Sequence, residues 1–96
     1  MLEIRKTEEF KDWLDSLKDL VGRAIIQARI KRLAEGNPGN TKYVGNKVSE
    51  MKIDFGPGYR IYYTQEESMI YLLLIGGNKR TQAKDIQAAK LLIKNL

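Results

Sequence analysis

The chain has 96 residues, of which 43% are hydrophobic and 30% charged, which suits one globular domain and is too short for two independent cores. It contains no cysteine, which excludes disulfides and thiolate metal sites. It also contains no histidine, the commonest general base at neutral pH. Any chemistry must therefore use lysine, arginine, tyrosine and carboxylate side chains.

No stretch of the sequence predicts a membrane segment or an export signal. The longest apolar run, residues 69–75, is far shorter than the ~20 residues that a membrane helix needs. The first residues lack the basic stretch followed by an apolar one that marks a secretory signal. We therefore expect a cytoplasmic protein without membrane contact.

Positive charge is concentrated towards the end of the chain. The formal net charge is +5, and residues 68–96 oppose only Asp85 to five basic side chains, which are Lys79, Arg80, Lys84, Lys90 and Lys94. Such a local surplus is typical of a site for a polyanion. A solvated basic helix would produce the same pattern, so both interpretations stay open.

Residues 2–35 predict a strand followed by two helices. Apolar and charged residues alternate over residues 2–6, as in a half-buried strand. Thr7 can cap the first helix. The apolar stripe of that helix consists of Phe10, Trp13, Leu14 and Leu17. The second helix reaches Glu35 and carries two apolar rows, namely Val21, Ile25, Ala28 and Ile26, Ile30, Leu33. Residues 36–46, rich in glycine and asparagine, predict a loop.

The alternation of residues 51–55 and 59–63 around a glycine-proline-glycine run predicts a β-hairpin. A three-residue loop would pair Phe55 with Tyr59 and place the apolar residues of both strands on one face. On the polar face, the same register would bring Asp54 opposite Arg60 and Lys52 opposite Tyr62.

Residues 69–75 are apolar on both faces and predict a strand that is central or covered on both sides. Thr81 can cap a final helix with the apolar stripe Ile86, Ala89, Ile93 and Leu96. The element order is thus β-α-α-β-β-β-α in a single domain, residues 1–96. This order predicts an α+β fold with a small antiparallel sheet and packed helices.

Two groups of residues are candidates for chemistry. Two glycines and the start of a helix flank Lys79 and Arg80, which is a plausible anion site although the spacing does not fit a Walker loop. On the hairpin, Arg60, Tyr62 and Lys52 share the polar face, and cations beside an aromatic ring suit single-stranded RNA. The plainer interpretation is an Arg60–Asp54 ion pair on an open sheet face. No carboxylates show the spacing of metal ligands, so we expect neither a metal nor another cofactor.

The run from Glu50 to Tyr63 and the segment from Gly76 to Ile86 together resemble the RelE/ParE toxin superfamily, most closely its HigB-like branch of addiction-module killer proteins. The resemblance covers nearly the whole chain and implies a toxin that cleaves mRNA on translating ribosomes. It places Arg60 at the scissile phosphate and Lys79 and Arg80 in the basic segment after the last strand. Asn78 departs from the family pattern, in which an aspartate is frequent.

With this resemblance, the expected catalytic residues are Arg60, Lys79, Arg80 and Tyr62, and the expected RNA-binding residues are Lys47, Lys52 and Lys84. Because histidine is absent, the general base would have to be a lysine or a tyrosine among positive charges. The implied partners are mRNA, the ribosome and a small helix-turn-helix antitoxin, with operator DNA bound only through the antitoxin complex. Two alternatives remain, a ParE-like binder that poisons DNA gyrase and an inactive member that acts as a corepressor.

Overall fold

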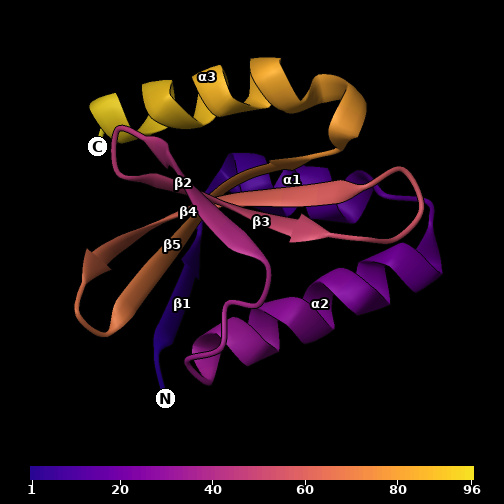
Figure 1. The fold of residues 1–96 in the computed structure, drawn as a ribbon, viewed down its shortest axis with the longest axis horizontal. Helices are drawn as coiled ribbons and strands as arrows, with labels where there is room; N and C mark the ends of the chain where they lie inside the picture. The colour runs from indigo at the N-terminus through magenta and orange to yellow at the C-terminus, as the bar shows by residue number, and fades with distance from the viewer.

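The computed structural model describes residues 1–96 as a five-stranded sheet with three α-helices (Figure 1). In chain order the elements are β1 (Glu3–Lys6), α1 (Glu8–Ser16), α2 (Leu20–Ala34), β2 (Thr41–Gly45), β3 (Val48–Ile53), β4 (Tyr59–Glu67), β5 (Ile70–Gly77), the 3₁₀ turn η1 (Lys79–Thr81) and α3 (Gln82–Lys94). The predicted α+β class is confirmed. None of the three helices combines the length and the hydropathy needed to cross a membrane.

The sheet is mixed, so the prediction of a wholly antiparallel sheet is wrong. Its strand order is β1-β5-β4-β3-β2, in which β1 runs parallel to β5 while all other neighbours are antiparallel. The chain leaves β1 through α1 and α2 and returns to the far edge of the sheet, where β2 begins. Only β5, the last strand, lies beside β1. The sequence of a single short strand does not indicate whether it runs parallel or antiparallel to its neighbour.

Strand β2 lies within residues 36–46, for which the sequence predicted only a loop. The prediction is wrong for Thr41–Gly45, which pair with β3 so that Lys42 lies opposite Glu50. The two strands are joined by Asn46 and Lys47, whose φ angles of 54° and 66° make the tight turn of a two-residue hairpin loop. The surrounding glycine and asparagine residues hide this short strand in the sequence.

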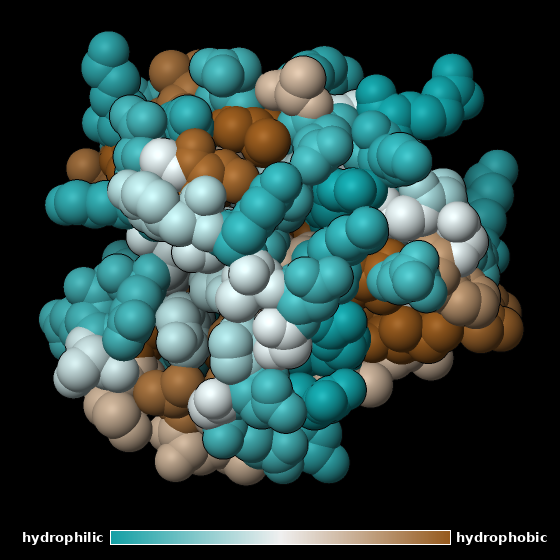
Figure 2. All heavy atoms as spheres, viewed as in Figure 1, coloured by the Kyte–Doolittle hydropathy of each residue, from teal (hydrophilic) through white to brown (hydrophobic).

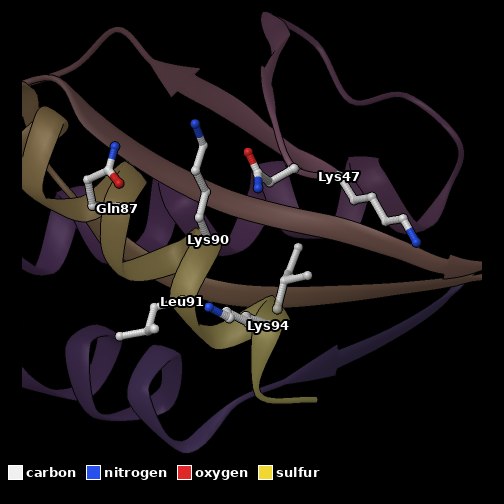
Figure 3. A pocket seen from close by; sticks show the side chains of 7 residues that line it. Lys47, Gln87, Lys90, Leu91 and Lys94 are labelled. Carbon is white, nitrogen blue, oxygen red and sulfur yellow. The ribbon is translucent and has the colours of Figure 1, made fainter.

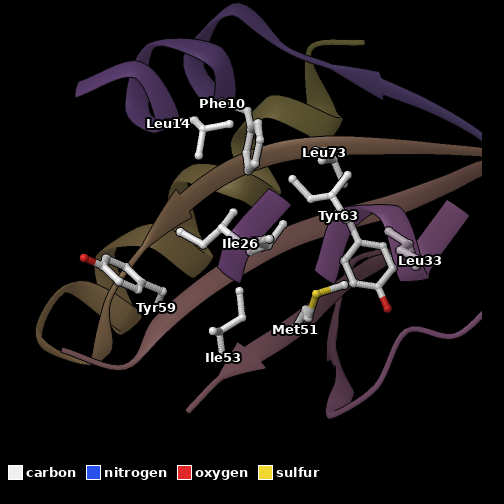
Figure 4. Close-up of a cluster of buried hydrophobic side chains, with 11 residues drawn as sticks. Phe10, Leu14, Ile26, Leu33, Met51, Ile53, Tyr59, Tyr63 and Leu73 are labelled. Carbon is white, nitrogen blue, oxygen red and sulfur yellow. The ribbon is translucent and has the colours of Figure 1, made fainter. Parts of the chain in front are cut away.

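Helices cover both faces of the sheet and create two cores. On one face, α1 and α2 bury the larger core, which includes Phe10, Leu14, Ile26, Leu33, Met51, Ile53, Tyr59, Tyr63 and Leu73 (Figure 4). On the other face, α3 covers a smaller core of Val48, Tyr62, Leu72, Leu74 and Ala89. Adjacent residues of β5 serve both cores, which confirms the prediction that this strand is covered on both sides.

The β3–β4 hairpin has the predicted parity but a register that is shifted by two residues. Ile53 pairs with Tyr59, so the loop has five residues, and Lys52 rather than Asp54 lies opposite Arg60. Glu50, not Lys52, lies opposite Tyr62. In this longer loop Gly56 and Gly58 adopt positive φ angles of 55° and 76°, a conformation that glycine reaches without strain.

One predicted helix cap is confirmed and the other is wrong. Thr7 Oγ1 accepts a hydrogen bond of 2.9 Å from the Phe10 N–H at the start of α1. Thr81 occupies the N-cap position of α3, but its side chain makes no capping hydrogen bond. The cap lies one turn earlier, where the Asn78 side chain accepts hydrogen bonds from the N–H groups of Arg80 and Thr81 at the start of η1. The Thr81 hydroxyl is used elsewhere, because it donates to the Asp85 carboxylate.

Candidate functional site

A polar hollow lies where the start of α3 meets the strands β2, β3 and β4. It has a volume of about 240 Å³ and no hydrophobic side chain lines it. The lining residues are Asn40, Lys42, Glu50, Lys52, Arg60 and Gln82. Lys42, Glu50 and Arg60 meet because side chains alternate along each strand and these three face α3. Asn40 is held nearby because its carbonyl, just before the start of β2, accepts a hydrogen bond from the Lys52 N–H. We call this feature the Arg60 hollow.

Arg60 is a buried cation that is only partly satisfied. The residue is 5% exposed, and its Nη1 donates a hydrogen bond of 2.8 Å to the Gly58 carbonyl. Its Nε has no hydrogen-bond partner, and the nearest carboxylate oxygen, Glu50 Oε2, lies 3.8 Å away. A buried N–H without a partner is rare in a folded protein, since it costs free energy unless another group binds it. Arg60 is therefore suited to an anionic ligand.

Glu50 holds the floor of the Arg60 hollow together. It is 3% exposed, and its Oε2 accepts hydrogen bonds from the Tyr62 hydroxyl at 3.0 Å and from Gln82 Nε2 at 2.8 Å. Its Oε1 lies 3.8 Å from Lys42 Nζ. This single carboxylate thus joins β2, β3, β4 and α3, and it is the only acidic group of the hollow.

Tyr62 lies beneath the hollow rather than in it. The sequence suggested a ring on an open sheet face, where it could stack on a base, but α3 covers that face and Tyr62 is completely buried. Burial and the hydrogen bond to Glu50 raise the pKa of Tyr62 well above its ordinary value. Tyr62 therefore acts as a protonated donor that orients Glu50, and its ring is not accessible for stacking.

Lys79 lies near Arg60 at the β3–β4 turn. The Lys79 N–H donates to the Pro57 carbonyl, which docks η1 on the β3–β4 turn. A Cβ atom placed on Gly58 would lie 3.2 Å from Arg60 Nη1 and 3.4 Å from Lys79 Cβ, so both side chains flank the same glycine. Arg80 follows on the exposed side of the turn.

The remaining predicted RNA-binding lysines are at different places. Lys52 lines the Arg60 hollow, while Lys84 is exposed on α3 and does not line it. Lys47 lies in the β2–β3 turn and lines a second, larger hollow together with Lys90 and Lys94 of α3 (Figure 3). The structure thus brings Arg60 and Lys52 together in one hollow, with Lys79 beside the same turn as Arg60, while Lys47 lines the second hollow and Lys84 lines neither.

Sequence reasoning missed four residues of the Arg60 hollow: Asn40, Lys42, Glu50 and Gln82. Glu50 carried a usable signal, since it lies on the same polar face of the predicted strand as Lys52. Lys42 could have been found in the same way had residues 41–45 been recognised as a strand. Gln82 could not, because only the docking of α3 brings it to the sheet. No group of three or more acidic side chains is placed to share a metal ion.

Comparison with known proteins gives one informative relative. No family model matches the chain. A protein of Haemophilus influenzae described as uncharacterized is 46% identical over 95 residues, which cover 99% of this chain and 96% of the relative. Identity at this level over the full length of both proteins shows common descent and a common fold. The chain belongs to the same family as this Haemophilus influenzae protein.

Proposed function

We propose that this protein is the toxin of a type II toxin-antitoxin system, of the RelE/ParE superfamily, and that it cleaves mRNA on translating ribosomes without a metal ion. The two sequence segments that resemble this superfamily include Arg60 and Lys79, which lie together around Gly58. In this proposal a small antitoxin with a helix-turn-helix domain holds the toxin inactive during growth.

The observation that carries the proposal is the unpartnered Nε of Arg60 in a wholly polar hollow. RNA can be cut when its own 2′-hydroxyl attacks the adjacent phosphorus, and negative charge then develops on the phosphorane oxygens. A guanidinium that lines the hollow and has an unused N–H would stabilise that charge. Removing one such donor typically slows a reaction by about 10²–10³-fold.

Glu50 is a better general base than the lysine or tyrosine that the sequence suggested. Its carboxylate lines the hollow 3.8 Å from Arg60 Nε, while Tyr62 is buried and protonated. In the proposed step the 2′-hydroxyl transfers its proton to Glu50 as the oxygen–phosphorus bond forms. The bond from phosphorus to the 5′-oxygen then breaks, and that oxygen takes a proton from an ammonium group.

Lysine side chains supply the acid and the remaining positive charge. Lys52 lines the hollow directly opposite Arg60 in the β3–β4 register, and Lys79 flanks Gly58 beside Arg60. In the proposed step Lys52 protonates the leaving 5′-oxygen, and Lys79 binds a neighbouring phosphate. The products would be a 2′,3′-cyclic phosphate and a 5′-hydroxyl end.

The test is inducible expression of the wild-type protein, Arg60→Ala and the matched control Arg32→Ala in a bacterial host. Arg32 is an exposed arginine of α2, on the opposite face of the sheet. We expect the wild type and the control to arrest growth and to produce mRNA fragments whose 5′ ends need phosphorylation before ligation. Arg60→Ala should slow this cleavage by about 10²–10³-fold.

Two results would contradict the proposal. Growth arrest with intact mRNA would show that the protein is not a nuclease, and accompanying DNA-damage signalling would favour gyrase poisoning instead. Equal mRNA cleavage by Arg60→Ala would show that the Arg60 hollow is not the catalytic site. Thermal melting of each purified variant establishes that it is folded.

A further inference from the structure

The second hollow lies at the other end of the interface between α3 and β2. It has a volume of about 590 Å³ and is lined by three lysines, Lys47, Lys90 and Lys94, by the amides of Asn46 and Gln87, and by the aliphatic side chains of Leu91 and Ile93. Figure 3 shows that Lys47 comes from the β2–β3 turn and Lys90 from α3. Along α3, hydrophilic side chains surround small hydrophobic patches (Figure 2). We call this feature the lysine hollow.

The positive charge of the lysine hollow is not neutralised within the protein. No carboxylate lines it, and none of its three lysines takes part in an ion pair. The Arg60 hollow differs, because Glu50 lies 3.8 Å from both Arg60 and Lys42. Three like charges without counter-charges repel one another, so an anionic ligand would stabilise this arrangement.

The backbone holds Lys47 at a defined place in the lysine hollow. Lys47 has a φ of 66°, a conformation that side-chain-bearing residues rarely adopt, in the tight turn with Asn46. The Tyr43 hydroxyl accepts a hydrogen bond of 2.9 Å from the Lys47 N–H. From the other side, Lys90 Nζ approaches the β2 backbone, since a Cβ atom on Gly45 would lie 3.4 Å from it.

We propose that the lysine hollow binds the phosphates of an RNA strand that extends from the Arg60 hollow along α3; this inference rests on the function proposed above. The same two elements border both hollows, through Lys42 and Gln82 at one end and Lys47 and Lys90 at the other. Eight residues of helix separate Gln82 from Lys90, which is about 12 Å. At a spacing of ~3.4 Å per stacked nucleotide, about four nucleotides cover this distance.

The chemistry of the lysine hollow suits phosphates rather than bases. Lysine ammonium groups and side-chain amides are typical phosphate contacts and do not discriminate between bases. The hollow contains no arginine fork, carboxylate or aromatic ring that could recognise a base edge or stack on it. It would therefore position any RNA sequence and add affinity in proportion to the length of the strand.

The experiment measures fluorescence anisotropy of labelled 2- and 12-nucleotide RNAs, of which only the longer one can span both hollows. Both are fully 2′-O-methylated, so they lack the attacking hydroxyl and stay intact. The test variant is Lys90→Glu/Lys94→Glu. The matched control is Lys18→Glu/Lys31→Glu, which makes the same charge change at exposed lysines outside both hollows.

We expect the wild type to bind the 12-mer more tightly than the 2-mer. The test variant should lose about tenfold or more in affinity for the 12-mer, and for the 2-mer no more than the control loses. The milder pair Lys90→Ala/Lys94→Ala should lower the slope of log K against log salt by about 1.4, as expected for two lost phosphate contacts on a single strand.

Three outcomes would overturn the inference. Unchanged 12-mer affinity in the test variant would show that RNA does not reach the lysine hollow. If a glutamate-rich peptide then bound the wild type but not the test variant, the hollow would belong to an acidic protein partner. An equal loss of 12-mer affinity in the control would show that only the net charge of the protein matters and not the position of these lysines. If the wild type bound neither RNA, this inference would be wrong and an RNA substrate would be contradicted as well. If the protein cleaved mRNA but the test variant bound RNA as the wild type does, only this inference would be wrong.

Discussion

Replacing Glu50 by leucine should reverse the effect of a second substitution, Tyr62→Phe. In the wild type the Tyr62 hydroxyl donates a hydrogen bond of 3.0 Å to the buried Glu50 carboxylate. Removing the hydroxyl deletes a hydrogen bond to a charged group and should lower the free energy of unfolding by about 1.5–3 kcal/mol. In the Glu50→Leu background the same hydroxyl is buried without an acceptor, so its removal should raise the free energy of unfolding by about 1–3 kcal/mol.

The single substitution Glu50→Leu should itself be strongly destabilising. It leaves the buried Arg60 guanidinium without its nearest carboxylate, 3.8 Å away, and Gln82 Nε2 without its acceptor. Breaking a buried pair by removing one partner costs about 3–5 kcal/mol. Small domains have total stabilities of about 5–15 kcal/mol, so the variant keeps a measurable free energy of unfolding where the wild-type value exceeds about 5 kcal/mol.

Urea unfolding of the wild type, both single variants and the double variant, followed by far-UV circular dichroism, measures all four free energies. The coupling between the two sites should be about 2.5 kcal/mol or more, at or above the upper end for residues in contact. If Tyr62→Phe lowered the free energy of unfolding equally in both backgrounds, Glu50 would not be the acceptor of the Tyr62 hydroxyl. The account of the Arg60 hollow, in which Glu50 is oriented from below, would then be wrong.

Two further predictions concern other parts of the fold. Gly76→Ala should lower the free energy of unfolding by about 1–3 kcal/mol, because the added methyl group would overlap the indole of Trp13. In a double-variant cycle measured by urea unfolding, the second substitution Trp13→Leu should reduce this loss. Hydrogen bonds from the Gly22 N–H and the Tyr59 hydroxyl lower the pKa of Asp19 in the folded protein. Asp19 therefore adds stability above its unfolded pKa near 3.8, and this stability is lost as the pH falls through the lower pKa of the folded state. Asp19→Asn should therefore show a weaker loss of stability between pH 4 and pH 2 than the wild type, and an identical acid dependence would contradict this assignment.

Much of the fold could be predicted because local patterns carry it. The cap at Thr7 and the Phe10–Leu14 stripe are set by neighbours in sequence, and parity alone placed Ile53 and Tyr59 on one face. The direction of β1 and the two-residue shift in the hairpin register depend on pairing across the sheet. A one-residue slip would bury polar side chains, whereas a two-residue slip keeps each side chain on its face and leaves no pattern to detect.

The Arg60 hollow could be predicted only in part. The alternation in β4 placed Arg60 on the polar face, but it gave no sign that α3 covers this face and buries Tyr62. The hydrogen bonds of Glu50 to Tyr62 and Gln82 join residues 12 and 32 positions apart, so no local spacing encodes them. Whether a polar side chain is exposed or buried depends on which element packs over it, and that is decided by the whole chain.

The parallel pairing of β1 with β5 has a consequence for the order in which the protein can assemble during synthesis. Residues 3–6 leave the ribosome well before residues 70–73, with which they pair in the sheet. Until residues 70–73 emerge, β1 is an unpaired strand, and contacts so distant in sequence form slowly. Gln82, which donates to Glu50, emerges later still. A nascent chain that stops before α3 therefore contains Arg60 but not the enclosed hollow around it, so incomplete products of translation should lack the assembled site.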